Sequence, residues 1–298
     1  MIKRTLYISS PCHLSVKNRQ LVISPGDKNR EERSVPVEDI GFVILENHSI
    51  TLTIKLVELL NENNAAVIFC NSQHMPCSML QNFSGHTTHA ENLKAQIETT
   101  VPLKKRLWAI TVKAKIRNQA GLLQKAGKTE YIQLQKMADS VKSGDIDNRE
   151  GTAARIYWRA LLGDEFKRER FGEYPNNIAN YGYAVLRAAI ARALAGTGLY
   201  PAIGIHHHNR YNAFALADDV IEPYRPFVDE IVYKHYNHSN EKTELTVEEK
   251  KAILTVLTCD VCFGKKRCPL MLGISKTTAS LAKCFLDKKL ELIYPDFS

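Results

Sequence analysis

The stretch Tyr200–Asp229, YPAIGIHHHNRYNAFALADDVIEPYRPFVD, places three consecutive histidines just before a segment rich in acidic residues. Pro201 and Gly204 near its start are typical of a tight turn, which can present side chains to a cleft. The segment from Asn212 to Arg225 predicts a helix, because its apolar residues recur at spacings of three and four. Carboxylates on such a helix, with a histidine just before it, are suitable ligands for a divalent metal such as Mg²⁺ or Mn²⁺.

A structural interpretation of the same residues stands beside the metal site. Asp218 and Glu222 lie one helical turn apart, and acidic residues on a helix usually form its solvated face. A run of histidines is typical of an exposed loop. Residue types in this stretch alone leave both interpretations open.

The composition favours a two-domain protein with an anionic partner. The chain has 298 residues, of which 44% are hydrophobic, enough for a core in each of two domains. Its formal net charge of +8 favours nucleic acid or an acidic surface as the partner. The N-terminal segment lacks a signal-peptide core, no apolar run reaches membrane-spanning length, and the seven cysteines lack paired, regular spacing. We therefore expect a cytoplasmic protein with no membrane partner and no disulfides.

Residues 1–90 are expected to form a small β-rich domain, because short β-rich runs recur there between turn signals. One helix interrupts them, with Ser49 as its predicted N-cap and an apolar stripe over residues 52–60. The segment 82–92 is predicted to connect the domains. Helical patterns dominate residues 91–298. The expected fold class is therefore α+β, with a small N-terminal β-rich domain followed by a larger all-α C-terminal domain.

Residues 103–128 predict a helix with strongly basic flanks. They contain eight lysines and arginines and no acidic residue. A basic helix flank often serves solubility alone, but the absence of any compensating acid favours contact with nucleic-acid phosphates. The eight basic residues are Lys104, Lys105, Arg106, Lys113, Lys115, Arg117, Lys125 and Lys128.

Glu150 fits two different roles. Asp147 followed three residues later by Glu150 matches a capping arrangement at the start of a helix, where the helix dipole favours a carboxylate. Gly151 argues for a functional role, because glycine in a first turn suits a place where another group must approach the backbone closely.

Cys259, Cys262 and Cys268 raise the question of a zinc site, because CxxC is half of one. A second half at a similar short spacing is missing, and Cys284 falls in a stretch predicted to be helical. The pattern favours small thiols, buried or partly exposed, over zinc ligands.

Four motifs, in this order, resemble one family. They are E-G-x-A-A-R-x-Y at Glu150–Tyr157, N-Y-G-Y-A-V-L at Asn180–Leu186, G-I-x-H at Gly204–His207, and L-A-D-D-V-I-E-P-Y-R-P-F-V-D at Leu216–Asp229. The chain strongly resembles CRISPR-associated protein one, the integrase and endonuclease of spacer acquisition, over its whole length. The segments KRLWAITVKAKIRNQA and LMLGISKTTASLAKCF look most like members from type II systems.

The resemblance implies a metal-binding, catalytic trio in the helical domain, consisting of Glu150, His207 and Glu222 and holding Mg²⁺ or Mn²⁺. Asp219, one turn before Glu222, would support the trio, and the residues alone leave open which of the three neighbouring histidines faces the metal. Further contacts to DNA are expected from Arg225, Tyr181, Lys104, Lys105, Arg106, Lys113 and Arg117.

The family also implies a reaction and partners. The 3′-hydroxyl of an incoming DNA fragment (the prespacer) would attack phosphodiesters of the CRISPR repeat, and water in its place would give nuclease activity. The β-rich domain would mediate dimerisation and partner contacts. A homodimer joined by CRISPR-associated protein two would form a heterohexamer, and other type II CRISPR proteins would be further partners. The alternatives are a non-catalytic DNA-binding scaffold and a zinc hydrolase.

Overall fold

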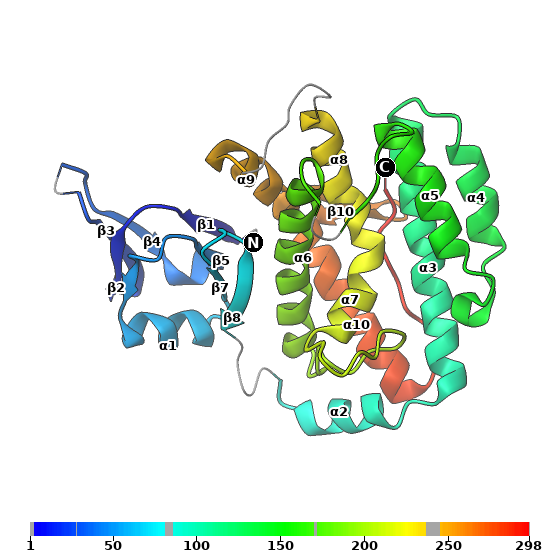
Figure 1. The fold of residues 1–298 in the computed structure, drawn as a ribbon. Coiled ribbons are helices and arrows are strands. Elements are labelled where there is room, and N and C mark those ends of the chain that lie inside the picture. Colours follow the sequence, from blue (N-terminus) through cyan, green and yellow to red (C-terminus); the bar gives the residue numbers. More distant parts are fainter. Residues whose placement is uncertain (1–2, 28, 81–85, 170–171, 237–244, 298) are drawn as a thin grey trace. The chain divides into compact units, whose positions relative to one another are not determined.

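The computed structural model describes residues 3–27, 29–80, 86–169, 172–236 and 245–297 (Figure 1). Its contacts divide the chain into two compact units, Met1–Gly85 and His86–Ser298. This division falls within the segment 82–92 that the sequence predicts as a connection. Residues 82–85 of that segment lie outside the described residues.

The N-terminal unit is built mainly from strands, as predicted. Its described residues form two four-stranded sheets, with strand orders β1-β5-β7-β8 and β4-β3-β2-β6. In the first sheet β1, β5 and β7 are parallel, and in the second β2, β3 and β4 are antiparallel. The strands are β1 (Arg4–Ile8), β2 (Cys12–Lys17), β3 (Gln20–Pro25), β4 (Arg33–Pro36), β5 (Ile40–Leu45), β6 (Thr51–Leu52), β7 (Ala66–Cys70) and β8 (Pro76–Leu80).

The core of this unit joins both sheets to the helix α1 (Ile54–Glu62). Leu14 and Leu21 from one sheet, Val43 from the other and Leu56 from α1 are among its buried residues. The strand β5, with the sequence IGFVIL, is buried along its whole length, which is typical of a parallel strand covered on both faces.

The helix α1 begins later than the sequence predicts. Thr53 is its N-cap, and the Thr53 side chain accepts a hydrogen bond from the amide of Leu56. Thr51 and Leu52 are extended because they pair with β2 as strand β6. The predicted cap at Ser49 is therefore wrong, since strand pairing keeps the chain out of the helical conformation through residue 52.

The C-terminal unit is organised around the long helix α3 (Val101–Lys125). α3 packs against α4, α5 and α8 and against the short 3₁₀ helix η3, and Figure 1 shows α3, α4 and α5 side by side. The other elements of the unit are α2 (His89–Ile97), α4 (Tyr131–Asp139), η2 (Ser143–Asp145), α5 (Arg149–Leu162), α6 (Asn176–Gly196), α7 (Ala215–Ile221), η3 (Glu222–Tyr224), α8 (Arg225–His235), α9 (Val247–Leu254), η4 (Thr255–Thr258), β9 (Asp260–Phe263), β10 (Lys266–Pro269) and α10 (Leu270–Asp287).

The helix α6 forms the second centre of the unit and packs against α7, α8, α9 and α10. Gly182 allows α6 to approach α8 closely, because a Cβ atom there would lie 2.5 Å from Cγ1 of Val228. Although α6 is largely buried and apolar, no helix in the described part of the chain combines the length and hydropathy needed to span a membrane.

The helical unit is not all-α, which corrects the sequence prediction. Strands β9 and β10 form an antiparallel hairpin after η4, in a segment partly predicted as helix. Its two-residue turn begins at Gly264 with φ of +59°, a conformation that glycine adopts without strain. The overall α+β class, a β-rich region followed by a mainly helical one, is confirmed.

Asp229 on α8 is a buried carboxylate where α5, α6 and α8 meet. It accepts hydrogen bonds from the hydroxyl of Tyr157, at 2.8 Å, and from that of Tyr183. Burial raises the pKa of Asp229 from 3.8 to about 6, although the two tyrosine hydrogen bonds and the nearby Arg168 and Arg225 act in the opposite direction. The folded protein therefore keeps this proton over a pH range in which the unfolded chain has lost it.

We predict that Asp229 makes stability fall with rising pH. A raised pKa contributes stability that is fully present below about pH 4 and is lost as the pH rises to about 6, because only the unfolded chain ionises freely in between. The difference corresponds to about 3 kcal/mol at most. Asp229→Asn has no carboxyl group to ionise at this position, so it should not show this loss. As the pH rises from about 4 to about 7, the thermal midpoint of the variant relative to the wild type should increase by several degrees. A difference in midpoint that stays constant with pH would contradict the assignment.

Candidate active site

The first turn of α5 is capped by residues other than Glu150. Asn148 is the N-cap, and its Oδ1 accepts a hydrogen bond from the amide of Gly151 at 3.1 Å. The carboxylate of Asp145 accepts hydrogen bonds from the first two amides of the helix at 2.9 and 3.0 Å. The predicted capping arrangement of Asp147 and Glu150 is therefore wrong. Asn148 takes the cap because its left-handed backbone, φ 48°, is a conformation that asparagine tolerates.

Gly151 leaves room for the capping side chain of Asn148. A Cβ atom at Gly151 would lie 2.8 Å from Oδ1 of Asn148. The group that approaches the backbone closely, as the sequence predicted, is thus the capping side chain itself. With the cap complete, the Glu150 carboxylate is available for other contacts.

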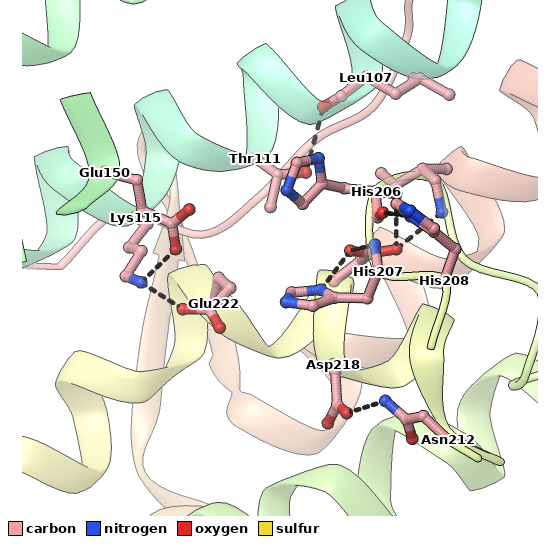
Figure 2. Close-up of polar contacts among 12 residues, drawn as sticks. Leu107, Thr111, Lys115, Glu150, His206, His207, His208, Asn212, Asp218 and Glu222 are labelled. Carbon is pink, nitrogen blue, oxygen red and sulfur yellow. Dashed lines mark hydrogen bonds and ion pairs between the residues drawn. The ribbon is translucent and has the colours of Figure 1, made fainter. Parts of the chain in front are cut away.

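Lys115 on α3 lies between the two acidic members of the predicted trio. Its Nζ is 2.6 Å from Oε1 of Glu150, in a hydrogen bond and ion pair, and 2.5 Å from Oε2 of Glu222, in an ion pair (Figure 2). Lys115 is only 8% exposed. Burial lowers the pKa of Lys115, but the two carboxylates outweigh this and raise it above its ordinary value, so Lys115 is a cation.

Glu222 begins η3 and is 3% exposed. Burial raises the pKa of Glu222, but Arg225 and Lys115 hold it below its usual value, so the carboxylate is ionised. Nη2 of Arg225 lies 2.9 Å from Oε1. The other oxygen, Oε2, is buried and accepts no hydrogen bond within the described parts of the chain, so its ion pair with Lys115 is its principal polar contact.

Asp219 holds the histidine turn. Its fully buried carboxylate accepts hydrogen bonds from the amides of Ile205, His206 and His207 at 2.7, 3.1 and 3.1 Å. Nδ1 of His207 lies 2.7 Å from Oδ1 of the same carboxylate, and this hydrogen bond is the main reason why the pKa of His207 is raised. Gly204 is required in the turn because a Cβ atom there would lie 2.2 Å from the carbonyl oxygen of His207.

The three histidines have different partners, which separates them as candidate ligands. The ring of His206 stacks on Trp108, with centroids 4.1 Å apart and planes 3° from parallel. Nδ1 of His208 contacts the carbonyl oxygen of His206 at 2.6 Å. Figure 2 shows the ring of His207 extending from the turn toward Glu222. Its Nδ1 contacts the Asp219 carboxylate. Nε2 of His207 is thus the nitrogen best placed to act with the two carboxylates.

Two members of the predicted trio therefore come together at one lysine, and the ring of the third, His207, extends toward Glu222 (Figure 2). Glu150 and Glu222 share Lys115, and the charge of Glu222 contributes to the raised pKa of His207. Among the residues that the structure describes, no group of three or more His, Cys, Asp or Glu side chains is arranged to hold a metal ion. In this conformation the cation between the carboxylates is an ammonium group.

Of two residues predicted to contact DNA, Arg225 is partly exposed and Tyr181 is buried. Arg225 is paired with Glu222, and its guanidinium lies over the ring of Tyr183, 4.8 Å from the centroid. Tyr181 is 0% exposed, because it lies within α6 and faces the core. This corrects the prediction for Tyr181: in this structure its ring is closed to a DNA backbone.

Five other basic residues of α3 fall into two groups. Arg117 and Lys113 lie near Asp139 at the end of α4, with nitrogen–oxygen distances of 3.0 and 3.8 Å. Lys105 and Arg106 are exposed near the start of α3, and Lys104 is half-buried. The start of α3 is therefore the more accessible basic surface.

The sequence prediction placed Lys115 among these basic residues and missed its place in the site. One signal was present in the sequence. Lys115 follows Leu107 and Thr111 at intervals of four on a helix face that the structure buries. A lysine on a buried face needs an acidic partner, and α3 contains no acidic residue, so the partner had to come from elsewhere.

The cysteines give little support to a zinc site. Cys262 and Cys268 are buried on strands β9 and β10, and Cys284 is buried on α10. Burial raises the pKa of the Cys259 thiol to about 12. Zinc binds the thiolate, so this shift disfavours Cys259 as a ligand.

Comparisons of the sequence with known proteins identify one family, and comparisons of the structure find the same fold. A family model described as CRISPR associated protein Cas1 matches residues 6–258. A CRISPR-associated endonuclease Cas1 from Neisseria meningitidis serogroup C is 36% identical over 289 residues, covering 97% of this chain and 94% of the relative. A casposase bound to integration product has a similar structure, with a TM-score of 0.78 at 21% identity over 100% of this chain and 93% of its own. A chain of a Cas6-RT-Cas1–Cas2 complex has a TM-score of 0.72 at 19% identity, over 97% of this chain and 36% of its own.

We predict that Asp219→Asn loosens the histidine turn. The substitution removes the charge and places an amide NH₂ against backbone donors. This should lower the free energy of opening the turn by roughly 3 kcal/mol. Amide hydrogen exchange at residues 205–207 should then accelerate by about a hundredfold, because about 1.4 kcal/mol corresponds to a factor of ten.

The matched control is Asp139→Asn, since the Asp139 side chain is 68% exposed and its ion pairs contribute little. Exchange at residues 205–207 should be unchanged in that variant. Equal protection of the turn in Asp219→Asn and wild type would show that Asp219 does not hold it.

Proposed function

Since this chain belongs to the family of CRISPR associated protein Cas1, whose members include endonucleases and integrases, we propose that it inserts new spacer DNA into a CRISPR array by metal-dependent chemistry. One observation carries the proposal. Two carboxylates from separate segments, Glu150 and Glu222, gather at one buried cation, and the ring of His207 extends toward Glu222 (Figure 2). Charged side chains gathered in this way, with the pKa of Glu222 lowered and the pKa values of Lys115 and His207 raised, are typical of an active site.

The donor set fits a hard divalent ion. The Oε2 atom of Glu222 is buried and accepts no hydrogen bond from the described residues, and its contact is an ion pair with the ammonium of Lys115, whose place a divalent ion would take. Glu150 would supply a second carboxylate and His207 a nitrogen, with Asp219 fixing the ring through Nδ1. We propose that these three residues hold Mg²⁺ or Mn²⁺. When bound, the ion would polarise the scissile phosphodiester and stabilise the leaving oxygen.

The proposed reaction exchanges one phosphodiester for another. The 3′-hydroxyl of the incoming DNA attacks a phosphorus atom of the repeat, a new P–O bond forms, and the 3′ oxygen of the cut repeat strand leaves with a proton. The number of phosphodiester bonds is unchanged, so no nucleotide cofactor is needed. Water as the nucleophile would give hydrolysis instead. In this scheme Asp219 orients His207, and Arg225 keeps Glu222 ionised and in place.

The DNA is proposed to lie along the exposed basic residues Lys105 and Arg106, near the start of α3. Contacts of this kind hold the backbone without selecting a sequence. By analogy with the similar chain in a Cas1–Cas2 complex, we propose a homodimer that assembles with Cas2 into a heterohexamer in the cytoplasm. Other type II CRISPR proteins are proposed as further partners.

We predict that Glu150→Gln and Glu222→Gln each lower strand transfer by about a thousandfold or more, because each removes one charged ligand, worth several kcal/mol in the transition state. Affinity for DNA should stay within about threefold, because neither residue is a positive contact. The measurement is integration of a labelled DNA fragment into a supercoiled repeat plasmid with Mn²⁺ and the purified Cas2 partner.

The exposed Glu165→Gln is the matched control and should integrate as the wild type does. Wild-type integration by either site variant would remove that residue from the active site. Wild-type integration by both would leave a DNA-binding scaffold as the better description of the chain.

We predict that Lys105→Glu combined with Arg106→Glu weakens DNA binding and its salt dependence. If both residues contact phosphates, the slope of log K against log salt concentration should become shallower by about two units, since each contact contributes about 0.9. Fluorescence anisotropy over a salt series gives the slope. Lys265→Glu with Lys266→Glu, an exposed pair on the β9–β10 hairpin, carries the same charge change as a control. Equal slopes for both double variants would reject the start of α3 as the DNA surface.

A further inference from the structure

Lys115 offsets the repulsion between the two carboxylates of the site. Glu150 and Glu222 approach the same point from α5 and η3, and Glu222 is almost fully buried. Two ionised carboxylates facing one another in such a place repel, and a buried charge without a partner costs several kcal/mol. The ammonium of Lys115, 2.6 and 2.5 Å from one oxygen of each, supplies the missing positive charge.

A divalent ion on the same carboxylates would compete with this ammonium. Lys115 occupies Oε1 of Glu150 and Oε2 of Glu222, the oxygens that face one another. A magnesium ion binds oxygen at about 2.1 Å, so an ion shared by these oxygens would lie where the ammonium now lies. An ammonium left within contact distance of the ion would add repulsion between like charges. The two cations therefore exclude one another.

We propose that Lys115 is a built-in substitute cation, which holds Glu150 and Glu222 together in the metal-free protein and must leave when the divalent ion binds. The inference rests on the proposed function, because it takes the trio to be a metal site. It adds a role for a residue outside the trio. Lys115 keeps the site assembled without metal, and it lowers the affinity for metal by competition.

The test compares Lys115→Met with the wild type in the absence of DNA. Methionine keeps an apolar stem of similar length and removes the charge. In the presence of a chelator, the variant should unfold at a temperature several degrees lower, because the two carboxylates lose their shared cation. By titration calorimetry at about pH 8, it should bind Mn²⁺ about tenfold more tightly or better, so that saturating Mn²⁺ closes the gap in unfolding temperature.

Two further variants make the comparison specific. Lys115→Arg keeps a cation at the same position and should bind Mn²⁺ no more tightly than the wild type. Lys136→Met removes an exposed lysine on α4 and should leave both the metal affinity and the unfolding temperature unchanged. Equal or weaker Mn²⁺ binding by folded Lys115→Met would overturn the inference and leave the metal site intact. Loss of Mn²⁺ binding in every protein, wild type included, would instead overturn the metal site itself.

A measurement on the wild type needs no folded variant. Reductive methylation of lysines, followed by mass spectrometry, reports how accessible each amine is. Lys115 should be labelled slowly without metal and at least about tenfold faster with saturating Mn²⁺, because its amine has left the two carboxylates. Lys136 should be labelled at the same rate in both conditions. An unchanged rate at Lys115 with Mn²⁺ bound would contradict displacement.

Discussion

The ion pair network of a single buried lysine is the constraint on which the helical unit depends. Glu222 is held within the core by Lys115 and Arg225, and Glu150 reaches Lys115 from the first turn of α5. α3 packs against both α5 and η3, and Lys115 contacts Glu150 on the one and Glu222 on the other. The packing of the long helix therefore also brings the charges of the site together, and removing one of these buried charges would leave its partners unpaired in the core.

The two buried carboxylates of the site are satisfied in different ways, and the difference suggests why their roles differ. Asp219 accepts hydrogen bonds from three backbone amides and contacts the ring of His207, so its oxygens are fully used by fixed donors. Oε2 of Glu222 has an ion pair with a flexible side chain and accepts no hydrogen bond from the residues described. A fixed donor cannot be exchanged for another ligand, whereas a lysine can move. Asp219 is thus suited to hold the histidine turn in place. Glu222 is suited to exchange the ammonium of Lys115 for another cation.

Local sequence rules failed where neighbouring structure or a competing side chain took precedence. Ser49 has the chemistry of an N-cap, but strand pairing through Leu52 moves the start of α1 to Thr53. Asp147 and Glu150 match a capping pattern, but Asn148 and Asp145 together satisfy the first amides of α5. Capping preferences are worth about 1 kcal/mol each, so partners supplied by other elements readily override them.

The sequence by itself determined the α+β class, the position of the acidic and histidine motifs, and the family. These follow from short-range periodicity and from the order of motifs along the chain, which do not depend on how distant segments meet. Only the tertiary structure decided that His207 is the ring turned toward Glu222, that Tyr181 is buried, and that Lys115 joins the two carboxylates. Each of these depends on contacts between segments far apart in the chain, and the free energy of a charge is set by its surroundings, which no local pattern records.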